Sequence, residues 1–237
     1  MSDRAIVLAG GMGTRLRPYT VVLPKPLMPV GEYPILEIIA RQLSQHGFSR
    51  ITMAVNHQAE IIKAFFYDGS KWGLQVDYSL ETKPLSTIAP LRLIADLPEH
   101  FLLMNGDVLT DLNFRALFDE HVKQDRLFTI AAARRKHTID YGVLHVKAGA
   151  LTGFDEKPSV EYMVSMGIYV VSRRILEFVP PDTKYGFDDL MRDMLAAGSP
   201  VHVESHDGYW LDIGRPDDYM QAIDEFGLRK EHFLLNG

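Results

Sequence analysis

The chain of 237 residues is 46% hydrophobic and 24% charged, a balance that favours a globular protein and excludes an intrinsically disordered one. Its formal net charge of -6 argues against a surface that binds nucleic-acid backbone, and its lack of cysteine excludes disulfides and cysteine-ligated zinc. No segment has the apolar length of a membrane span or the pattern of a secretory signal, so we expect a cytoplasmic protein that binds neither nucleic acid nor membrane.

The first half of the chain alternates strand and helix signals. Short apolar runs, often β-branched, indicate strands at positions 3–8, 50–55, 74–79 and 100–104. Apolar residues at the spacing of a helix indicate helices at 34–45, 59–66 and, despite Pro90, 87–94. Alternation of this kind predicts a mostly parallel sheet with helices on both of its faces.

The second half of the chain places several strands close together. We expect strands at 127–133, 142–146, 151–154, 165–171 and 200–204. Helices are expected at 114–123, 173–178, 187–197 and 216–226, with fraying over the last ten or so residues. The clustered strands favour a mixed sheet. Because the chain has no repeat, low-complexity segment or linker, residues 1–237 are predicted to form a single domain.

A glycine-rich loop directly follows the first predicted strand. Residues 8–29 read LAGGMGTRLRPYTVVLPKPLMP, and the loop glycines are Gly10, Gly11 and Gly13. Glycine lets backbone N–H groups approach an anion closely, so such a loop can cradle phosphates. The forked guanidinium of Arg15 and the compact charge of Lys25 also suit a triphosphate. The alternative is an ordinary turn with solvated basic residues.

Two other kinds of phosphate-binding loop do not fit this stretch. A Walker A loop requires Gly-Lys followed by Ser or Thr, which the stretch lacks. A dinucleotide-binding loop requires a third glycine where Leu16 stands, and a later acidic residue at a strand end, whereas Glu32 is expected in a turn. These departures argue against a P-loop ATPase and against a nicotinamide-dependent reductase.

The same stretch resembles the signature of the sugar-1-phosphate nucleotidylyltransferases, in which the glycine loop is followed by Thr-Arg-Leu, Pro-Tyr-Thr and Pro-Lys-Pro. The order of motifs is similar to that of the family from about residue 3 to residue 224. The resemblance implies an α/β fold, a Rossmann-like three-layer αβα sandwich with a mixed, mostly parallel sheet. The residues that it implies for nucleotide binding are Leu8, Gly10, Gly11, Gly13, Thr14, Arg15, Lys25, Ser86 and Thr87.

Two aspartates stand at the ends of predicted strands. Asp107 follows the apolar run 101–104, at an edge where open α/β sheets bind ligands, and Asp212 precedes a loop within the segment 208–216. Either aspartate alone is more often a helix cap or a turn residue. Their Asn-Gly-Asp and Trp-Leu-Asp-Ile-Gly motifs resemble those of the family, which implies that both carboxylates hold Mg²⁺. Magnesium in proteins usually takes one or two carboxylates together with substrate phosphates.

Two motifs between the aspartates are assigned to the sugar 1-phosphate. Tyr-Gly-Val at 141–143 and Glu-Lys-Pro at 156–158 resemble family motifs, although Glu-Lys-Pro by itself is ordinarily a solvated turn. The resemblance implies that the Gly142 backbone faces the sugar, that Glu156 accepts hydrogen bonds from sugar hydroxyls and that Lys157 holds the attacking phosphate. The residues expected to act in the in-line attack are Arg15, Lys25, Asp107 and Lys157.

Two segments depart from the family pattern. Ser86 stands where the family usually has the first glycine of Leu-Gly-Thr-Ala-Gly, near the base, and Pro90 follows the position of the second. Ser165 and Met166 stand where the family often has Asn-Ala. The resemblance places the Asn side chain on the sugar, and here the shorter Ser165 takes its position. Met166 would lie near the sugar ring or pack beneath it. The alternative is that both residues only repack the strand.

The run Pro-Lys-Pro-Leu-Met-Pro-Val is most similar to short mannose-1-phosphate guanylyltransferase-like members. We therefore expect transfer from GTP to a mannose-type or modified sugar 1-phosphate, giving an NDP-sugar and pyrophosphate. UTP, dTTP and CTP remain alternatives, and a non-catalytic regulatory subunit that binds an NDP-sugar is the rival from another class. We expect a monomer or homodimer without the C-terminal β-helix domain of many relatives.

Overall fold

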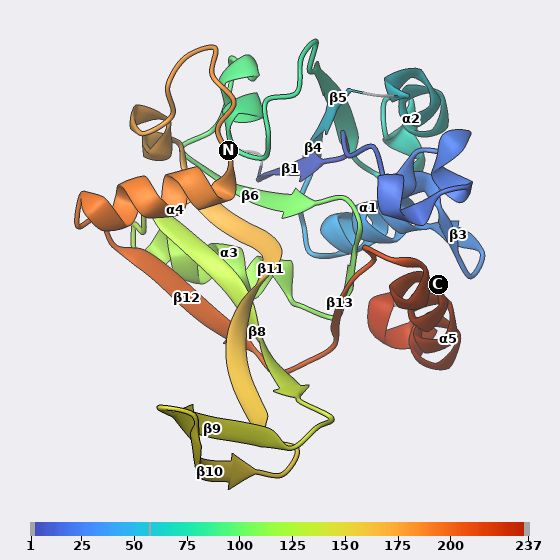
Figure 1. The fold of residues 1–237 in the computed structure, drawn as a ribbon. Coiled ribbons are helices and arrows are strands. Elements are labelled where there is room, and N and C mark those ends of the chain that lie inside the picture. The colour runs from blue at the N-terminus through green and yellow to red at the C-terminus, as the bar shows by residue number, and fades with distance from the viewer. Residues whose placement is uncertain (1–2, 57, 235–237) are drawn as a thin grey trace.

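A computed structural model describes residues 3–56 and 58–234 (Figure 1). The α-helices are α1 (Ile35–Gln45), α2 (Ala59–Phe66), α3 (Phe114–Lys123), α4 (Phe187–Ala196) and α5 (Pro216–Phe233). The strands are β1 (Arg4–Leu8), β2 (Pro29–Val30), β3 (Tyr33–Pro34), β4 (Arg50–Val55), β5 (Gln75–Leu80), β6 (His100–Asn105), β7 (Val108–Thr110), β8 (Phe128–Thr138), β9 (Val143–Lys147), β10 (Ala150–Asp155), β11 (Ser159–Ser172), β12 (Val201–His206) and β13 (Trp210–Asp212). The short 3-10 helices are η1 (Thr14–Leu16), η2 (Tyr19–Val21), η3 (Lys25–Leu27), η4 (Ser70–Trp72), η5 (Ala89–Leu93) and η6 (Arg173–Glu177). Within the described ranges, no helix combines the length and the apolar character needed to cross a membrane.

Seven strands form the main sheet, in the order β12-β8-β11-β6-β1-β4-β5. Strand β1 pairs in parallel with β4 and β6, β4 pairs in parallel with β5, and β12 pairs in parallel with β8. Strand β11 runs antiparallel to both β6 and β8. The expectation of a mixed, mostly parallel sheet is thus confirmed. Because β1, β4, β5 and β6 run the same way, their carboxyl ends share one edge of the sheet, where ligands bind in folds of this kind.

Helices cover both faces of the sheet, which gives the predicted three layers (Figure 1). Ala5 and Val7 of β1 belong to a buried cluster that includes side chains of α1, α2, α3 and α5. Ile6, between them, belongs to a second cluster with side chains of α4, η5 and η6. This alternation follows from the geometry of a strand, since successive side chains point to opposite faces.

A hairpin of β9 and β10 extends away from the main sheet, at the bottom of Figure 1. It is carried by the long strands β8 and β11, whose pairing continues as far as Thr138 opposite Ser159. The side chains of β8 are buried up to Ala133 and exposed beyond it, so this part of the chain leaves the hydrophobic core. We call residues 134–163 the arm.

Several expected elements differ in type or length. The segment 87–94 contains the 3-10 helix η5, which begins only at Ala89, so that Pro90 stands in its first turn, where proline is tolerated. The segment 173–178 likewise forms the 3-10 helix η6. Strands β8 and β11 are longer than expected because they build the arm. Helix α5 continues to Phe233 across a kink at Arg229, and the buried ring of Phe233 stacks on Phe226, so the expected fraying before residue 234 is wrong. Residues 235–237 lie outside the described part.

Candidate active site

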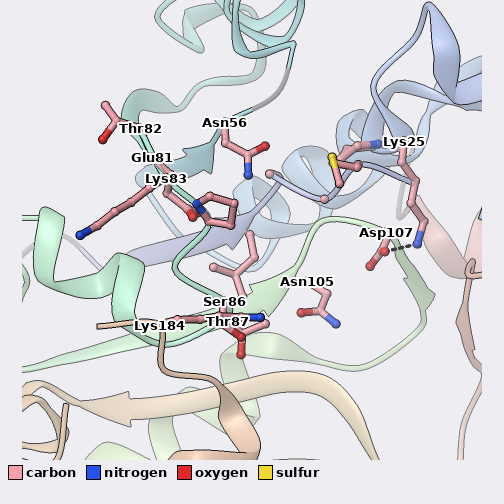
Figure 2. Close-up of a pocket in the computed structure, with 16 residues that line it drawn as sticks. Lys25, Asn56, Glu81, Thr82, Lys83, Ser86, Thr87, Asn105, Asp107 and Lys184 are labelled. Carbon is pink, nitrogen blue, oxygen red and sulfur yellow. Dashed lines mark hydrogen bonds and ion pairs between the residues drawn. The ribbon is translucent and has the colours of Figure 1, made fainter. Parts of the chain in front are cut away.

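A cleft of about 690 Å³ opens at the sheet edge where β1, β4, β5 and β6 end. A residue just beyond each of these strands lines it: Gly10 after β1, Asn56 after β4, Glu81 after β5 and Asp107 after β6. Figure 2 shows Lys25 and Asp107 together at one end, and Glu81 and Lys83 toward the other. The predicted site residues that line the cleft are Leu8, Gly10, Gly11, Lys25, Ser86, Thr87 and Asp107.

The glycine loop is packed against the stem of Lys25. Gly13 has a positive φ of 58°. A Cβ atom at this position would lie 2.8 Å from Cγ2 of Thr20 and 3.0 Å from Cβ of Lys25, so a larger residue would displace the loop. The Thr20 hydroxyl donates to the Gly13 carbonyl at 2.7 Å and fixes the approach. Gly13 therefore allows Lys25 to pack closely against the loop, and it also adopts the backbone shape expected of a phosphate loop.

Lys25 forms an ion pair with Asp107 across the end of the cleft (Figure 2). Its Nζ atom donates to Oδ2 of Asp107, and Lys25 as a whole is only 8% exposed. The buried prolines 24 and 26 flank it on the chain, at η3. The other carboxylate oxygen, Oδ1 of Asp107, is buried and has no hydrogen-bond partner within the described residues. One oxygen of this carboxylate is therefore left unsatisfied by the described residues.

The short strands β7 and β13 bring Asp212 beside Asp107. In their antiparallel pairing Asp212 lies opposite Val108, the residue after Asp107. The N–H of Ile213 donates to the Asp107 carbonyl at 3.1 Å. Asp212 is exposed on one side, but the protein atoms around it remove part of its surrounding water. This loss of water and, second, the nearby Asp107 charge raise the pKa of Asp212, and the Lys25 charge partly offsets the rise. The rise in pKa thus reflects first the loss of water and second the charge of the neighbouring Asp107 carboxylate.

Arg15 joins the same cluster from the glycine loop. A Cβ atom on Gly214 would lie 3.2 Å from Oδ2 of Asp212 and 3.4 Å from an Nη atom of Arg15, so both groups surround this glycine. Among the described residues, no three His, Asp or Glu side chains are grouped to hold a metal ion. Asp107 and Asp212 are two neighbouring carboxylates, and Mg²⁺ usually takes one or two carboxylates when substrate phosphates complete its shell. The partnerless Oδ1 of Asp107 fits such an ion.

The part of the cleft lined by Ser86 and Thr87 is joined to the loop before α4. Ser86 adopts a positive φ of 74°, and the hydroxyl of Thr87 accepts a hydrogen bond of 2.9 Å from the N–H of Phe187. The N–H of Tyr185 donates to the Leu85 carbonyl at 3.0 Å. These bonds hold the preceding residue, Lys184, beside Ser86 and Thr87 in the cleft (Figure 2).

The residues assigned to the sugar 1-phosphate lie apart from this cleft. Gly142, Glu156 and Lys157 belong to the arm, and none of them lines the cleft. Gly142 and Glu156 are neighbours, because a Cβ atom on Gly142 would lie 3.4 Å from an Oε atom of Glu156. Lys157 occupies a turn with a positive φ of 46° and is exposed. Their roles toward the sugar stay predictions.

Ser165 and Met166 are engaged within the protein. The Ser165 hydroxyl lies 3.1 Å from the hydroxyl of Tyr169 and accepts the N–H of Gly167 at 3.3 Å. Met166 is fully buried in the core, and its carbonyl accepts the indole N–H of Trp210 at 2.9 Å. The expectation that Met166 lies near the sugar ring is corrected, because this side chain is buried in the hydrophobic cluster, whereas packing beneath the ring and repacking of the strand are both compatible with its burial.

Further polar residues of the cleft were missed by the sequence analysis: Asn56, Glu81, Thr82, Lys83, Asn105 and Lys184. Two of them carried a usable signal, because Asn56 directly follows the predicted strand 50–55 and Glu81 comes shortly after the predicted strand 74–79, as Asp107 comes shortly after 100–104. Lys83 and Lys184 lie in loops without such a signal. Lys83 donates to the Asp182 carbonyl at 3.1 Å, which ties the two loops together.

Comparison with known proteins gives related sequences over nearly the whole chain. A family model described as nucleotidyl transferase matches residues 4–227. A UTP–glucose-1-phosphate uridylyltransferase from Synechocystis sp. is 32% identical over 93% of this chain and 62% of the relative. A mannose-1-phosphate guanyltransferase from Yarrowia lipolytica is 32% identical over 92% of this chain and 62% of the relative. The chain thus spans less than two thirds of the length of these two relatives.

Two further comparisons cover the other protein almost completely. A D-glycero-α-D-manno-heptose 1-phosphate guanylyltransferase from Aneurinibacillus thermoaerophilus is 28% identical over 97% of this chain and 99% of the relative. Among solved structures, HddC from Yersinia pseudotuberculosis has a TM-score of 0.73 and 24% identity, covering 95% of this chain and 100% of the other. This structural likeness establishes a shared fold.

Proposed function

The chain belongs to the nucleotidyl transferase family, and on this basis we propose that it transfers a nucleotidyl group from a nucleoside triphosphate to a sugar 1-phosphate. The observation that supports this activity best is the charged cluster at the end of the cleft. There the carboxylates of Asp107 and Asp212 lie beside the cations of Lys25 and Arg15, next to a glycine loop. Such a cluster suits a triphosphate whose α-phosphorus is to be attacked.

The proposed reaction needs no covalent intermediate and no strong base. An oxygen of the sugar phosphate forms a bond to the α-phosphorus, and the bond to the oxygen that bridges the α- and β-phosphates breaks. Pyrophosphate leaves with that electron pair, and the attacking phosphate is already ionised near neutral pH. The protein therefore contributes position and charge: Lys25 and Arg15 toward the triphosphate and Lys157 toward the attacking phosphate.

Asp107 and Asp212 are the residues that would hold Mg²⁺. When bound, this ion supplies charge neutralisation between the two phosphate groups that must meet. The proposal is supported by the buried, partnerless Oδ1 of Asp107 and by the raised pKa of Asp212. Before the substrates bind, Asp107 would also keep Lys25 at the correct depth of the cleft through its second oxygen.

We further propose GTP as the nucleotide. Glu81 is half-buried at the end of the cleft away from Asp107, where its carboxylate accepts the Leu85 N–H at 3.3 Å. A carboxylate can accept from the N1–H and N2–H groups of guanine, whereas uracil and thymine do not present two adjacent donors. Lys184, in the same cleft, can donate to the guanine O6 or N7 acceptor. Two of the similar relatives are named as guanylyltransferases.

For the acceptor we propose a manno-configured sugar 1-phosphate. The supporting relatives are the mannose-1-phosphate and manno-heptose 1-phosphate enzymes, the second of which this chain matches over nearly its full length. Gly142 and Glu156 lie close enough together on the arm to contact one sugar ring. A carboxylate such as that of Glu156 accepts hydrogen bonds from neighbouring sugar hydroxyls, so it can discriminate between sugars that differ in the configuration of these hydroxyls.

The test is pyrophosphate release with magnesium, measured for GTP, UTP, dTTP and CTP against mannose, glucose and manno-heptose 1-phosphates. GTP with a manno-configured acceptor should give the highest kcat/KM. The matched control is Asp107→Asn, which keeps the shape of the side chain and removes its charge. If no combination releases pyrophosphate while the protein still binds an NDP-sugar, the chain is a non-catalytic sensor and the proposal fails.

A further inference from the structure

Lys25 occupies one oxygen of the carboxylate that we assign to the metal. We propose that Lys25 is the resident counter-ion of Asp107 in the free protein and that it exchanges this carboxylate for the nucleotide phosphates when a divalent cation binds. The exchange rests on the proposed function, since it concerns how the same site is loaded. In this proposal Lys25 first positions Asp107 and then becomes a ligand of the triphosphate.

The burial of Lys25 requires a counter-ion. Its side chain is 10% exposed, and an ammonium group at this depth is costly unless it is paired. Within the described part of the chain, Asp107 is the acidic side chain that forms an ion pair with it. In the absence of both divalent cation and nucleotide, Lys25 therefore remains on Asp107 and keeps that carboxylate turned into the cleft.

The backbone around Lys25 leaves movement to its side chain. The residue lies in η3 between two buried prolines. Its Cβ atom is packed against Gly13, since a Cβ atom added to Gly13 would lie only 3.0 Å from it. Proline fixes its own φ, so this segment resists a change of backbone shape. The ammonium group can leave Asp107 by rotation about the outer bonds of the side chain, toward the cleft that Lys25 lines.

A divalent cation cannot share Asp107 with Lys25 without repulsion. It would bind to the partnerless Oδ1, while the ammonium stays on Oδ2 of the same carboxylate. Two cations on adjacent oxygens repel each other unless an anion lies between them. The triphosphate is such an anion and gives Lys25 a second partner. Binding of metal and nucleotide should therefore be coupled, and by linkage each should strengthen the other.

The first test measures Mn²⁺ binding to the nucleotide-free protein by electron paramagnetic resonance. We compare the wild type with Lys25→Met, which keeps the length of the side chain and removes its charge. The matched control is Lys83→Met, which removes a positive charge from the same cleft but from a lysine that donates to a backbone carbonyl. Lys25→Met should bind Mn²⁺ at least tenfold more tightly than the wild type, and Lys83→Met less than threefold. If Lys25→Met binds Mn²⁺ no more tightly than Lys83→Met, the exchange is refuted.

A second test uses the wild type and does not depend on the folding of a variant. Acetylation of lysines by an N-hydroxysuccinimide ester is followed by mass spectrometry with and without saturating Mn²⁺. Lys25 should react severalfold faster with Mn²⁺, because its ammonium leaves the carboxylate, while the exposed Lys184 should react at an unchanged rate. An unchanged rate at Lys25 would overturn the exchange.

The outcomes also separate this inference from the proposed function. Failure of pyrophosphate release with every substrate pair would refute the activity, yet the effect of Lys25 on Mn²⁺ binding would stand. Conversely, full activity of the wild type together with equal Mn²⁺ affinities of the two methionine variants would refute the exchange alone.

Discussion

The two proposed metal ligands should respond differently to loss of charge. Asp107→Asn and Asp212→Asn each remove one carboxylate, and each should lower kcat by about a hundredfold or more, the size of effect seen when one charge-stabilising group is lost. Their effects on folding should diverge, because Asp107 is paired with a buried lysine while Asp212 opens to solvent.

The size of the folding effect follows from the ion pair. The side chains of Lys25 and Asp107 are 10% and 21% exposed, so Asp107→Asn leaves a buried ammonium facing only a neutral amide. Loss of a hydrogen bond to a charged group costs about 1.5–3 kcal/mol, and we take about 2 kcal/mol because Asp107 is partly exposed. For a protein of this length, that corresponds to a fall in Tm of about 4–8 °C.

Asp212→Asn should leave Tm unchanged or raise it. The pKa of Asp212 is raised in the folded protein by loss of surrounding water and by Asp107, so its charged form is less favourable there than in the unfolded chain. Removing that charge removes an unfavourable interaction, which is the sign that linkage requires.

The assays are thermal unfolding in metal-free buffer at pH 7 and pyrophosphate release with magnesium. Equal Tm values for Asp107→Asn and the wild type would show that Lys25 does not depend on this carboxylate. Full activity of either variant with magnesium as the only metal would refute the assignment of that aspartate as a ligand.

Four other substitutions test separate parts of the molecule. Arg15→Ala should lower kcat at least tenfold with unchanged Tm, since the exposed arginine contributes little to folding; normal turnover would contradict a phosphate role. Glu81→Gln should lower kcat/KM about tenfold for GTP, a loss of about 1.4 kcal/mol in transition-state stabilisation, and should not lower it for UTP. Equal losses for the two nucleotides would contradict recognition of the guanine base by Glu81. The pKa of His121 is lowered from 6.5 to about 3, mainly by burial and further by His100 and nearby cations. As the pH falls, the imidazole is therefore protonated in the unfolded chain before it is protonated in the folded protein. The wild type should thus lose about 2 kcal/mol of stability between pH 7 and 5 that His121→Asn does not lose, and parallel denaturation profiles would refute this. Met166→Ala should lower the free energy of unfolding by about 3 kcal/mol without altering kcat/KM ratios among sugar phosphates; altered ratios would return Met166 to the sugar pocket.

The sequence by itself determined most of the individual elements. Strand 50–55 and helices 59–66 and 114–123 have the predicted bounds, because their apolar periodicity and their stop signals are local. The same local reading placed the glycine loop after the first strand and Asp107 at the end of another. Applied without exception to every parallel strand end, it would also have found Asn56 and Glu81.

Helix type and strand length were less accessible from local patterns. Pro90 stands within an apolar stretch of helical spacing, yet proline suits the first turn of a helix and not its interior, so the helix begins only at Ala89. Strand β8 continues into exposed residues after Ala133, where no buried face imposes an alternation. What sustains it is pairing with β11, a partner more than twenty residues further along the chain.

Only the tertiary structure decided which charges meet. Lys25 and Asp107 are 82 positions apart and come together because the glycine loop packs at the end of β6. Asp212 reaches Asp107 through β7 and β13, strands of three residues each, too short to carry a periodic signal. Met166 is buried in the core, in the part of β11 where its pairing with β8 is interrupted between Ser165 and Tyr169. Periodicity along a sequence records which side of its own element a residue faces, whereas these contacts depend on how distant elements pack against one another.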